Sequence, residues 1–388
     1  MARQGSNRKR IKVFYYIPSL AQGGTERQVL ALISSLPDDF EPILCLQENR
    51  IFYSDLLPEG QPKYCLDTRR MNLRSLFRLK GFIEQEKPHI LHSFRDRGNS
   101  WARVAGIMAH VPVIISSCRN RGMNLRHLLI ERFLSERADA VLTNSEGVKK
   151  DLVRFARVRK EKIFVIPNIL DVEYFREPTE DERKAARSHY GFDDNTFVFS
   201  VPGRISFQKN QIGLVVGIAL LLLRQKTEHE WVVVFAGRRR DKGVATLFDA
   251  LRRIGPIARV TRFIGEERDV RRLYFASDCI VVPSLYEGMS NTVLEACACG
   301  VPTIVSNAAN MDGIVLDQVT GFEVQALNIF EISNAMLRMM SLSQAQRSKM
   351  GRLARERVLK EIVRAPNYSL QEVVKVYREL LKRKGIEV

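Results

Sequence analysis

The strongest constraint on the fold is an alternation of short apolar runs, rich in β-branched residues, with stretches of helical spacing. A series of such strand–helix units predicts a parallel sheet with helices on both faces. The strands predicted in the first half are 10–17, 43–46, 89–93, 113–117, 138–144 and 163–166. The helices predicted between them are 28–36, 73–86, 101–109, 125–136 and 146–156.

The pattern breaks at 167–171 and restarts after a charged stretch, 176–187, that indicates a linker and a helix. The strands predicted in the second series are 196–202, 231–236, 260–264, 279–282 and 303–306. Since single cores rarely grow beyond about 250–300 residues, a chain of 388 residues favours two domains.

We therefore predict an α/β protein with two Rossmann-like, doubly wound domains facing a central cleft, with ligands at the carboxyl ends of the strands. The predicted domains are 1–170 and 190–366, joined by a linker at 171–189. The final amphipathic helix, within 369–388, is predicted to pack back on the first domain.

Composition places the chain among globular proteins with a strongly basic surface. The formal net charge is +17, from 61 basic and 44 acidic residues, which favours nucleic acid, an anionic membrane or anionic substrates as partners. The six cysteines lie mostly in apolar runs, as expected for free thiols in a reducing cytosol. No secretory signal is visible, and the most apolar helical stretch, 212–223, is too short to span a bilayer. We expect a cytoplasmic protein, peripheral on the inner face of the cell membrane.

Part of the positive charge is interleaved with apolar residues in the first half. No nucleic-acid-binding motif accompanies it, so nucleic acid is not an expected partner, and the mixture resembles a membrane-interfacial surface. The residues assigned to this surface are Arg69, Arg70, Arg74, Phe77, Arg78, Arg119 and Arg121. The alternative is that the apolar residues face the core and the arginines face water.

The stretch 278–306 carries the most specific chemistry. An apolar strand leads to Glu287, the N-cap types Ser290 and Asn291 begin a helix, and Glu295 lies about one turn inside it. The free N–H groups at this helix start form an anion site between two acids. A nucleotide sugar, with a diphosphate between two sets of hydroxyls, fits that arrangement. The alternative is an ordinary loop charge and a solvated acid, but Glu295 precedes Ala-Cys-Ala-Cys-Gly and is therefore expected to be buried.

Two other strand ends carry phosphate-binding residue types. Gly23 and Gly24 follow the first strand, where glycines let backbone N–H groups approach a phosphate. Arg204 follows a strand of the second series and Lys209 comes five residues later, so that two cations can hold a pyrophosphate. An ordinary turn and two surface cations are the alternatives.

Taken together, these pieces resemble the retaining GT-B glycosyltransferases of family 4 (group 1). The resemblance runs through Gly-Gly-Thr-Glu-Arg at 23–27, His92, the segment 165–171, Gly203-Arg204 with Lys209, 263–265, 283–288, 294–302 and 320–321. It implies that domain 1–170 binds the acceptor and domain 190–366 the donor. Departures from the family pattern include Ile169 where relatives have glycine, and Ser290 where proline is common.

The resemblance also implies the role of each site residue. Gly23, Gly24, Arg204 and Lys209 would bind the donor phosphates, Glu287 the sugar and Glu295 the ribose, with Ile264 and Gly265 facing the base. The backbone of Gly288, Met289, Ser290 and Asn291 would assist Glu287, and His92, at a strand end, would lie near the transferred sugar. The residues implied as catalytic are His92, Glu287, Arg204 and Lys209.

The implied reaction moves a hexose or N-acetylhexosamine from a nucleotide-diphosphate sugar, expected to be UDP-linked, to a lipid-linked or envelope polysaccharide acceptor. It would retain anomeric configuration by front-face attack, with no cofactor and no metal. No Asp-x-Asp and no His/carboxylate cluster lies near the phosphate loops. The alternatives are a nucleotide-sugar 2-epimerase and a non-catalytic protein that binds anionic membranes.

Overall fold

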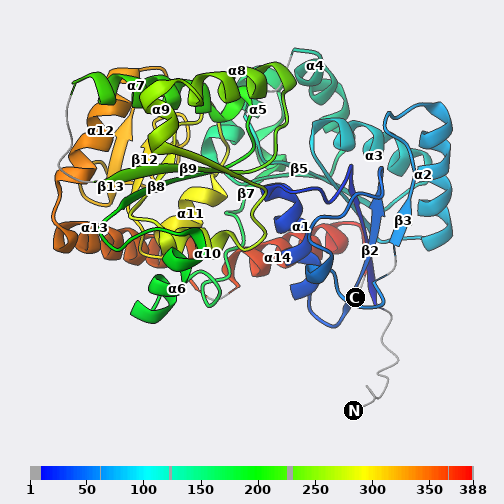
Figure 1. The fold of residues 1–388 in the computed structure, drawn as a ribbon. Coiled ribbons are helices and arrows are strands. Elements are labelled where there is room, and N and C mark those ends of the chain that lie inside the picture. Colours follow the sequence, from blue (N-terminus) through cyan, green and yellow to red (C-terminus); the bar gives the residue numbers. More distant parts are fainter. Residues whose placement is uncertain (1–9, 62, 122–124, 225–229, 366, 387–388) are drawn as a thin grey trace. The chain divides into compact units, whose positions relative to one another are not determined.

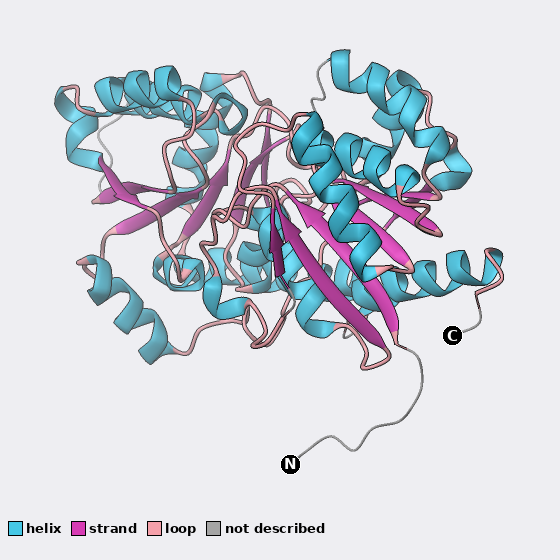
Figure 2. Cartoon of the chain, turned by 90° about the vertical axis from the view of Figure 1, so that its right-hand side faces the viewer, coloured by secondary structure: helices cyan, strands magenta, loops and turns pink. Residues whose placement is uncertain are grey.

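The computed structural model describes residues 10–61, 63–121, 125–224, 230–365 and 367–386. The chain divides into two compact units (Figure 1). Unit 1 contains Met1–Ile169 and Asn367–Val388, and unit 2 contains Leu170–Pro366. Strands with helices packed around them make up both units (Figure 2). Within the described chain, no helix is both long enough and apolar enough to cross a membrane.

Unit 1 is built on a parallel sheet in the order β3-β2-β1-β4-β5-β6-β7. Its strands are β1 (Ile11–Ile17), β2 (Phe40–Leu46), β3 (Lys63–Cys65), β4 (Ile90–Phe94), β5 (Val113–Cys118), β6 (Ala140–Thr143) and β7 (Ile163–Val165). The predicted parallel sheet is confirmed. The sequence missed β3, which is a short edge strand and therefore has little periodicity to detect.

Helices cover both faces of this sheet. Along β1, Val13 and Tyr15 face one side with α1 (Gly24–Ser35) and α14 (Tyr368–Arg383), while Phe14 and Tyr16 face the other. That second side carries a row of helices in which each packs against the next. The row consists of α2 (Leu73–Glu86), α3 (Asp96–Met108), α4 (Leu125–Leu134) and α5 (Glu146–Ala156).

The last helix, α14, belongs to unit 1 although the whole of unit 2 precedes it in the chain (Figure 1). Its apolar stripe, which includes Val373, Tyr377 and Leu381, enters the same core as α1 and the adjacent sheet face. Amphipathic spacing produces this stripe, since residues three and four apart share one side of a helix.

Unit 2 repeats the architecture with the strand order β10-β9-β8-β11-β12-β13. The strands are β8 (Phe197–Pro202), β9 (Trp231–Ala236), β10 (Thr261–Gly265), β11 (Cys279–Val282), β12 (Thr303–Ser306) and β13 (Gly321–Val324), all paired in parallel. Its helices are α6 (Glu180–Tyr190), α7 (Gln211–Arg224), α8 (Lys242–Arg252), α9 (Gly255–Val260), α10 (Val270–Ala276), α11 (Asn291–Ala298), α12 (Ile329–Ser341) and α13 (Gln344–Arg357). The sequence missed the edge strand β13, whose four residues include the exposed Glu323.

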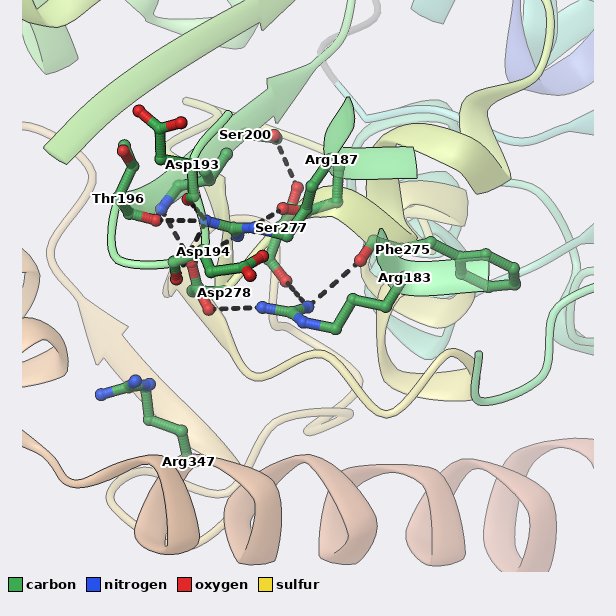
Figure 3. Close-up of polar contacts among 12 residues, drawn as sticks. Arg183, Arg187, Asp193, Asp194, Thr196, Ser200, Phe275, Ser277, Asp278 and Arg347 are labelled. Atoms are coloured by element: carbon green, nitrogen blue, oxygen red, sulfur yellow. Dashed lines mark hydrogen bonds and ion pairs between the residues drawn. The ribbon is translucent and has the colours of Figure 1, made fainter. Parts of the chain in front are cut away.

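The stretch 171–189, predicted as the interdomain linker, belongs to unit 2, and Figure 3 shows Arg183 and Arg187 of its helix α6 with their polar contacts. Arg187 of α6 is 3% exposed and donates to the carboxylate of Asp278 at 3.3 Å and to the Ala276 carbonyl at 3.1 Å. It also donates to the carbonyls of Asp193 (2.5 Å) and Thr196 (2.6 Å). This buried guanidinium therefore ties α6 to the strand β11 and to the loop before β8.

Candidate functional site

In unit 2, Glu287 lies in the loop between β11 and α11 and is 8% exposed. Its Oε1 accepts from Nζ of Lys209 at 2.5 Å, and its Oε2 accepts from Nε2 of Gln208 at 3.3 Å. Nε2 of Gln208 also donates to the Tyr286 carbonyl, while the backbone carbonyl of Gln208 accepts from the Leu285 N–H. The loops that follow β8 and β11 are thereby joined around one buried carboxylate.

Glu295 lies in the second turn of α11 and is 5% exposed, as expected from the small apolar residues that follow it. Its Oε2 accepts from the Tyr274 hydroxyl at 2.7 Å, and Tyr274 of α10 is itself fully buried. Burial of a carboxylate requires such a partner. Tyr274 therefore fixes the orientation of this acid.

The N-terminus of α11 separates these two carboxylates. Its N-cap is Ser290, whose side chain makes no capping hydrogen bond. Among the described residues, the buried hydroxyls of Ser290 and Ser284 have no hydrogen-bond partner. The N–H groups at this helix start, beside the buried Ser290 hydroxyl, can bind an anion.

The neighbouring strand ends of unit 2 are held close together by their backbones. Gly203 donates to Ala236 at 2.7 Å, and Gly237 donates to Gly265 at 2.6 Å. A Cβ on Gly237 would overlap the Gly203 carbonyl, and Gly237 has φ 146°, so glycine is required there. Arg204 directly follows Gly203, and the 36%-exposed Ile264 directly precedes Gly265.

Unit 1 holds the other predicted loop, Gly23-Gly24, at the start of α1. A Cβ on Gly23 would collide with the carboxylate of Glu26, which is 1% exposed. Oε1 of Glu26 accepts from Arg95 at 2.5 Å, whereas its Oε2 has no partner among the described residues. The space at Gly23 therefore accommodates a protein carboxylate, a feature that the sequence reasoning did not foresee.

His92 is the third of five residues in β4, which corrects its predicted position at a strand end. It is fully buried, with Nδ1 2.5 Å from the Tyr377 hydroxyl and Nε2 2.8 Å from the Ser117 hydroxyl. Burial, together with the charge of Arg119, lowers the pKa of His92 well below its ordinary value. Both ring nitrogens thus bind side chains of unit 1, and a role near the sugar stays a prediction.

The residues predicted to form a membrane surface have mixed environments. Arg69, Arg70, Arg74 and Arg78 are exposed, as is Phe77 at 57%. Arg119 instead donates to Gln28 and Asn168, and Arg121 forms a two-point pair with Asp151 at 2.6 and 2.9 Å. The two interpretations of 69–82 are each partly right, because Leu76 and Leu79 face the core while Leu73 (69% exposed) and Phe77 do not.

Sequence reasoning missed three residues that shape these sites, namely Gln208, Tyr274 and Glu26. Gln208 is adjacent in sequence to Lys209, and Glu26 lies within the motif at 23–27. Adjacency to residues already assigned to the site could therefore have indicated both. Tyr274 lies in a different helix, α10, 21 residues before its partner, and gave no signal.

Two family models match the chain in succession. The model described as Glycosyltransferase Family 4 matches residues 22–174, and that described as Glycosyl transferases group 1 matches residues 182–357. The chain is 24% identical over 351 residues to an Escherichia coli enzyme, UDP-Gal:alpha-D-GlcNAc-diphosphoundecaprenol alpha-1,3-galactosyltransferase. That alignment covers 86% of this chain and 89% of the relative.

Two solved structures share the fold over almost their whole length. HepE of Anabaena, solved in complex with UDP and glucose, matches with a TM-score of 0.84 and 16% identity, over 95% of this chain and 100% of HepE. A glycosyltransferase from Rickettsia africae ESF-5 matches with a TM-score of 0.81 and 19% identity, over 97% of this chain and 100% of that structure.

Proposed function

Because the chain belongs to the group 1 and family 4 glycosyltransferases and has the GT-B fold, we propose that its donor is a UDP-sugar and its acceptor a lipid-linked or envelope glycan. The sugar transferred would be a hexose or an N-acetylhexosamine. The observation that carries this proposal is the arrangement of Gln208, Lys209 and Glu287 beside the N-terminus of α11.

The donor would lie along the carboxyl ends of the strands of unit 2. Glu295, oriented by Tyr274, would accept hydrogen bonds from the ribose hydroxyls, and the backbone at 264–265 would face the base. The diphosphate would lie near the start of α11 and the side chains of Arg204 and Lys209. Glu287 would accept hydrogen bonds from the hydroxyls of the sugar.

The ion pair between Lys209 and Glu287 fixes the orientation of the carboxylate, because both side chains are largely buried, at 16% and 10% exposed. An ammonium group has three donors, and Lys209 can therefore bind a phosphate oxygen while it keeps Glu287. Such preorganisation lowers the free energy needed to arrange charges during reaction.

The proposed chemistry is a metal-independent transfer with retention. The bond between the sugar's anomeric carbon and the diphosphate oxygen breaks, and a bond from that carbon to the acceptor oxygen forms on the same face. The acceptor hydroxyl gives its proton to the departing diphosphate, whose added negative charge is stabilised by Arg204, Lys209 and the helix N-terminus. Neither Glu287 nor Glu295 needs to act as an acid or base.

The acceptor class is supported by the Escherichia coli relative, whose name describes transfer to an undecaprenol-linked sugar. A lipid-linked acceptor would bring the protein to a membrane surface. The exposed basic residues at the start of α2 and the exposed Leu73 and Phe77 support such contact.

A Glu287→Gln substitution tests the donor site. We expect the variant to remain folded, although Lys209 loses its ionic partner, and to lose sugar transfer and donor hydrolysis by about a hundredfold, since one charged contact in the transition state is removed. The matched control is Glu180→Gln, whose carboxylate is 73% exposed on α6. Both would be assayed against a panel of UDP-sugars.

The wild-type protein should also gain thermal stability when UDP is added, because a ligand that binds only the folded state stabilises it. The absence of any shift with nucleoside diphosphates would refute the proposed donor class. An unchanged turnover of Glu287→Gln would remove this glutamate from the site.

A further inference from the structure

The outer side of α4 and α5 exposes large apolar side chains that no motif accounts for. On α4 these are Leu129 (49% exposed), Ile130 (39%) and Phe133 (73%). On α5 they are Val153 (37%) and Phe155 (53%). We call these five residues the α4–α5 surface. The two helices pack against each other, so their exposed residues belong to one region of unit 1.

Both helices bury other residues against unit 1, so these exposed side chains lie on the sides of the helices turned away from its core. In α5, Val148, Leu152 and Ala156 face the sheet and pack with Val141 and Ile163. In α4, Glu131 is buried and pairs with the buried Arg103 at 2.8 Å. The register of α4 is therefore fixed by an ion pair, and Leu129, Ile130 and Phe133 point outward for that reason.

Positive charge accompanies this apolar region. Exposed cationic residues stand beside or between its members on both helices: Arg132, Lys150, Arg154 and Arg157. The guanidinium of Arg154 lies 5.2 Å from the Phe155 ring centroid. The nearby acids Asp151 and Glu136 are paired, with Arg121 at 2.6 Å and with Arg159 at 3.2 Å. The exposed charge next to the apolar side chains is thus mainly positive.

We propose that the α4–α5 surface inserts its apolar side chains into the interface of an anionic lipid bilayer, with these cations contacting the headgroups. Apolar residues that enter the acyl boundary beneath a ring of Lys and Arg are the arrangement by which helices lie on membranes. A protein partner would need no excess of one charge, whereas an anionic bilayer attracts each cation near its surface.

The α4–α5 surface differs from the membrane surface predicted from the sequence. That prediction included Arg119 and Arg121, but both are bound to polar partners within unit 1. The exposed pair Leu73 and Phe77 on α2 lies in the same row of helices, with α3 between α2 and α4. The α4–α5 surface has more apolar residues than α2, and we assign it the larger share of the binding.

The experiment measures binding of the full chain to vesicles of phosphatidylcholine with or without phosphatidylglycerol, by co-flotation at low and high salt. A Phe133→Ser, Phe155→Ser double variant should bind anionic vesicles at least about tenfold more weakly, because two large apolar anchors are lost. A Lys150→Gln, Arg154→Gln variant should lose only the part of the binding that depends on anionic lipid and low salt.

Two matched controls locate the effect. Leu327→Ser, Phe330→Ser changes a pair in unit 2 that is at least as exposed, at 80% and 54%, and should bind vesicles like the wild type. Leu73→Ser, Phe77→Ser changes the α2 pair and should cause the smaller loss. If the α2 variant alone loses binding, or if the α4–α5 variant binds normally, the proposal is refuted.

A third outcome would identify a different occupant. If the wild type forms a dimer in solution and the Phe133→Ser, Phe155→Ser variant is monomeric with unchanged vesicle binding, the surface serves a second copy of this chain. Membrane insertion of the α4–α5 surface rests on the proposed lipid-linked acceptor, but vesicle binding is measured independently of the donor site. The stabilisation of each variant by UDP reports on the donor site alone, so failure of the donor assignment leaves the vesicle result interpretable.

Discussion

Replacement of Arg187 by methionine should weaken unit 2 strongly, although its hydrogen-bond partners (Figure 3) are not among the proposed donor-site residues. Methionine preserves much of the apolar stem of the side chain and removes the charge and its donors. Arg187 is 3% exposed, and its guanidinium binds the Asp278 carboxylate and the Ala276 carbonyl, both within the fold. Two further bonds go to carbonyls of Asp193 and Thr196.

The size of the stability loss depends on whether each hydrogen-bond partner of Arg187 can bind another donor after the substitution. Residue 193 is exposed and residue 196 is partly exposed, so their carbonyls can bind water instead. Asp278 keeps Arg183 at 2.7 Å and the Val198 N–H at 2.8 Å, but loses one charged donor at a side chain that is 13% exposed. Loss of that charged bond and of a donor to a buried carbonyl should together lower the free energy of unfolding by about 3–5 kcal/mol.

Urea unfolding followed by fluorescence can measure this change within one unit. Trp231 lies in β9 of unit 2 and Trp101 lies in unit 1, so a Trp101→Phe background makes the signal specific for unit 2. The control is Lys184→Met, which removes a 60%-exposed cation from the same helix and should change stability by less than about 0.5 kcal/mol. Equal stability of the Arg187→Met and Lys184→Met proteins would refute the reasoning.

Two further predictions concern buried polar groups. Tyr274→Phe removes the hydroxyl that orients Glu295, and we expect a weaker stabilisation by UDP and a raised KM for the donor with a smaller effect on kcat, measured by thermal shift and steady-state assay. His92 has a lowered pKa when folded, so the unfolded chain binds its proton more readily below the ordinary value of 6.5. Stability should therefore be complete above pH 6.5 and fall by up to about 1.4 kcal/mol per pH unit below it, a slope that His92→Phe should reduce in urea titrations read from Trp101; parallel slopes would contradict this.

The sheets were predictable because their central strands are continuous apolar runs. Strands such as β9 and β11 are buried along their entire length, and such runs bounded by turns indicate a parallel sheet. The edge strands β3 and β13 escaped detection because each has three or four residues with partial exposure. The sequence of an edge strand carries little pattern of its own, because pairing with a single neighbouring strand fixes its extended conformation.

The candidate donor site was predictable in its residue types and only partly in its contacts. Glu295 could be assigned to a buried position from the small residues beside it, which the structure confirms. Its partner Tyr274 belongs to another helix, and the bond depends on tertiary packing that no local spacing encodes. His92 shows the opposite error, because its side chain was assigned to a strand end although it lies in mid-strand, bonded to Tyr377 from the last helix.

The place of α14 in unit 1 has a consequence for how the protein is made. Since a ribosome releases the chain from its N-terminus, all of unit 2 emerges before α14, which together with α1 covers one face of the unit 1 sheet. Until then Tyr15, His92 and the apolar side chains that meet Val373 and Leu381 lack the contacts that α14 supplies. Nascent unit 1 therefore stays incomplete during the synthesis of almost 200 further residues, from Leu170 to Pro366. In that interval it would present an apolar sheet face to chaperones.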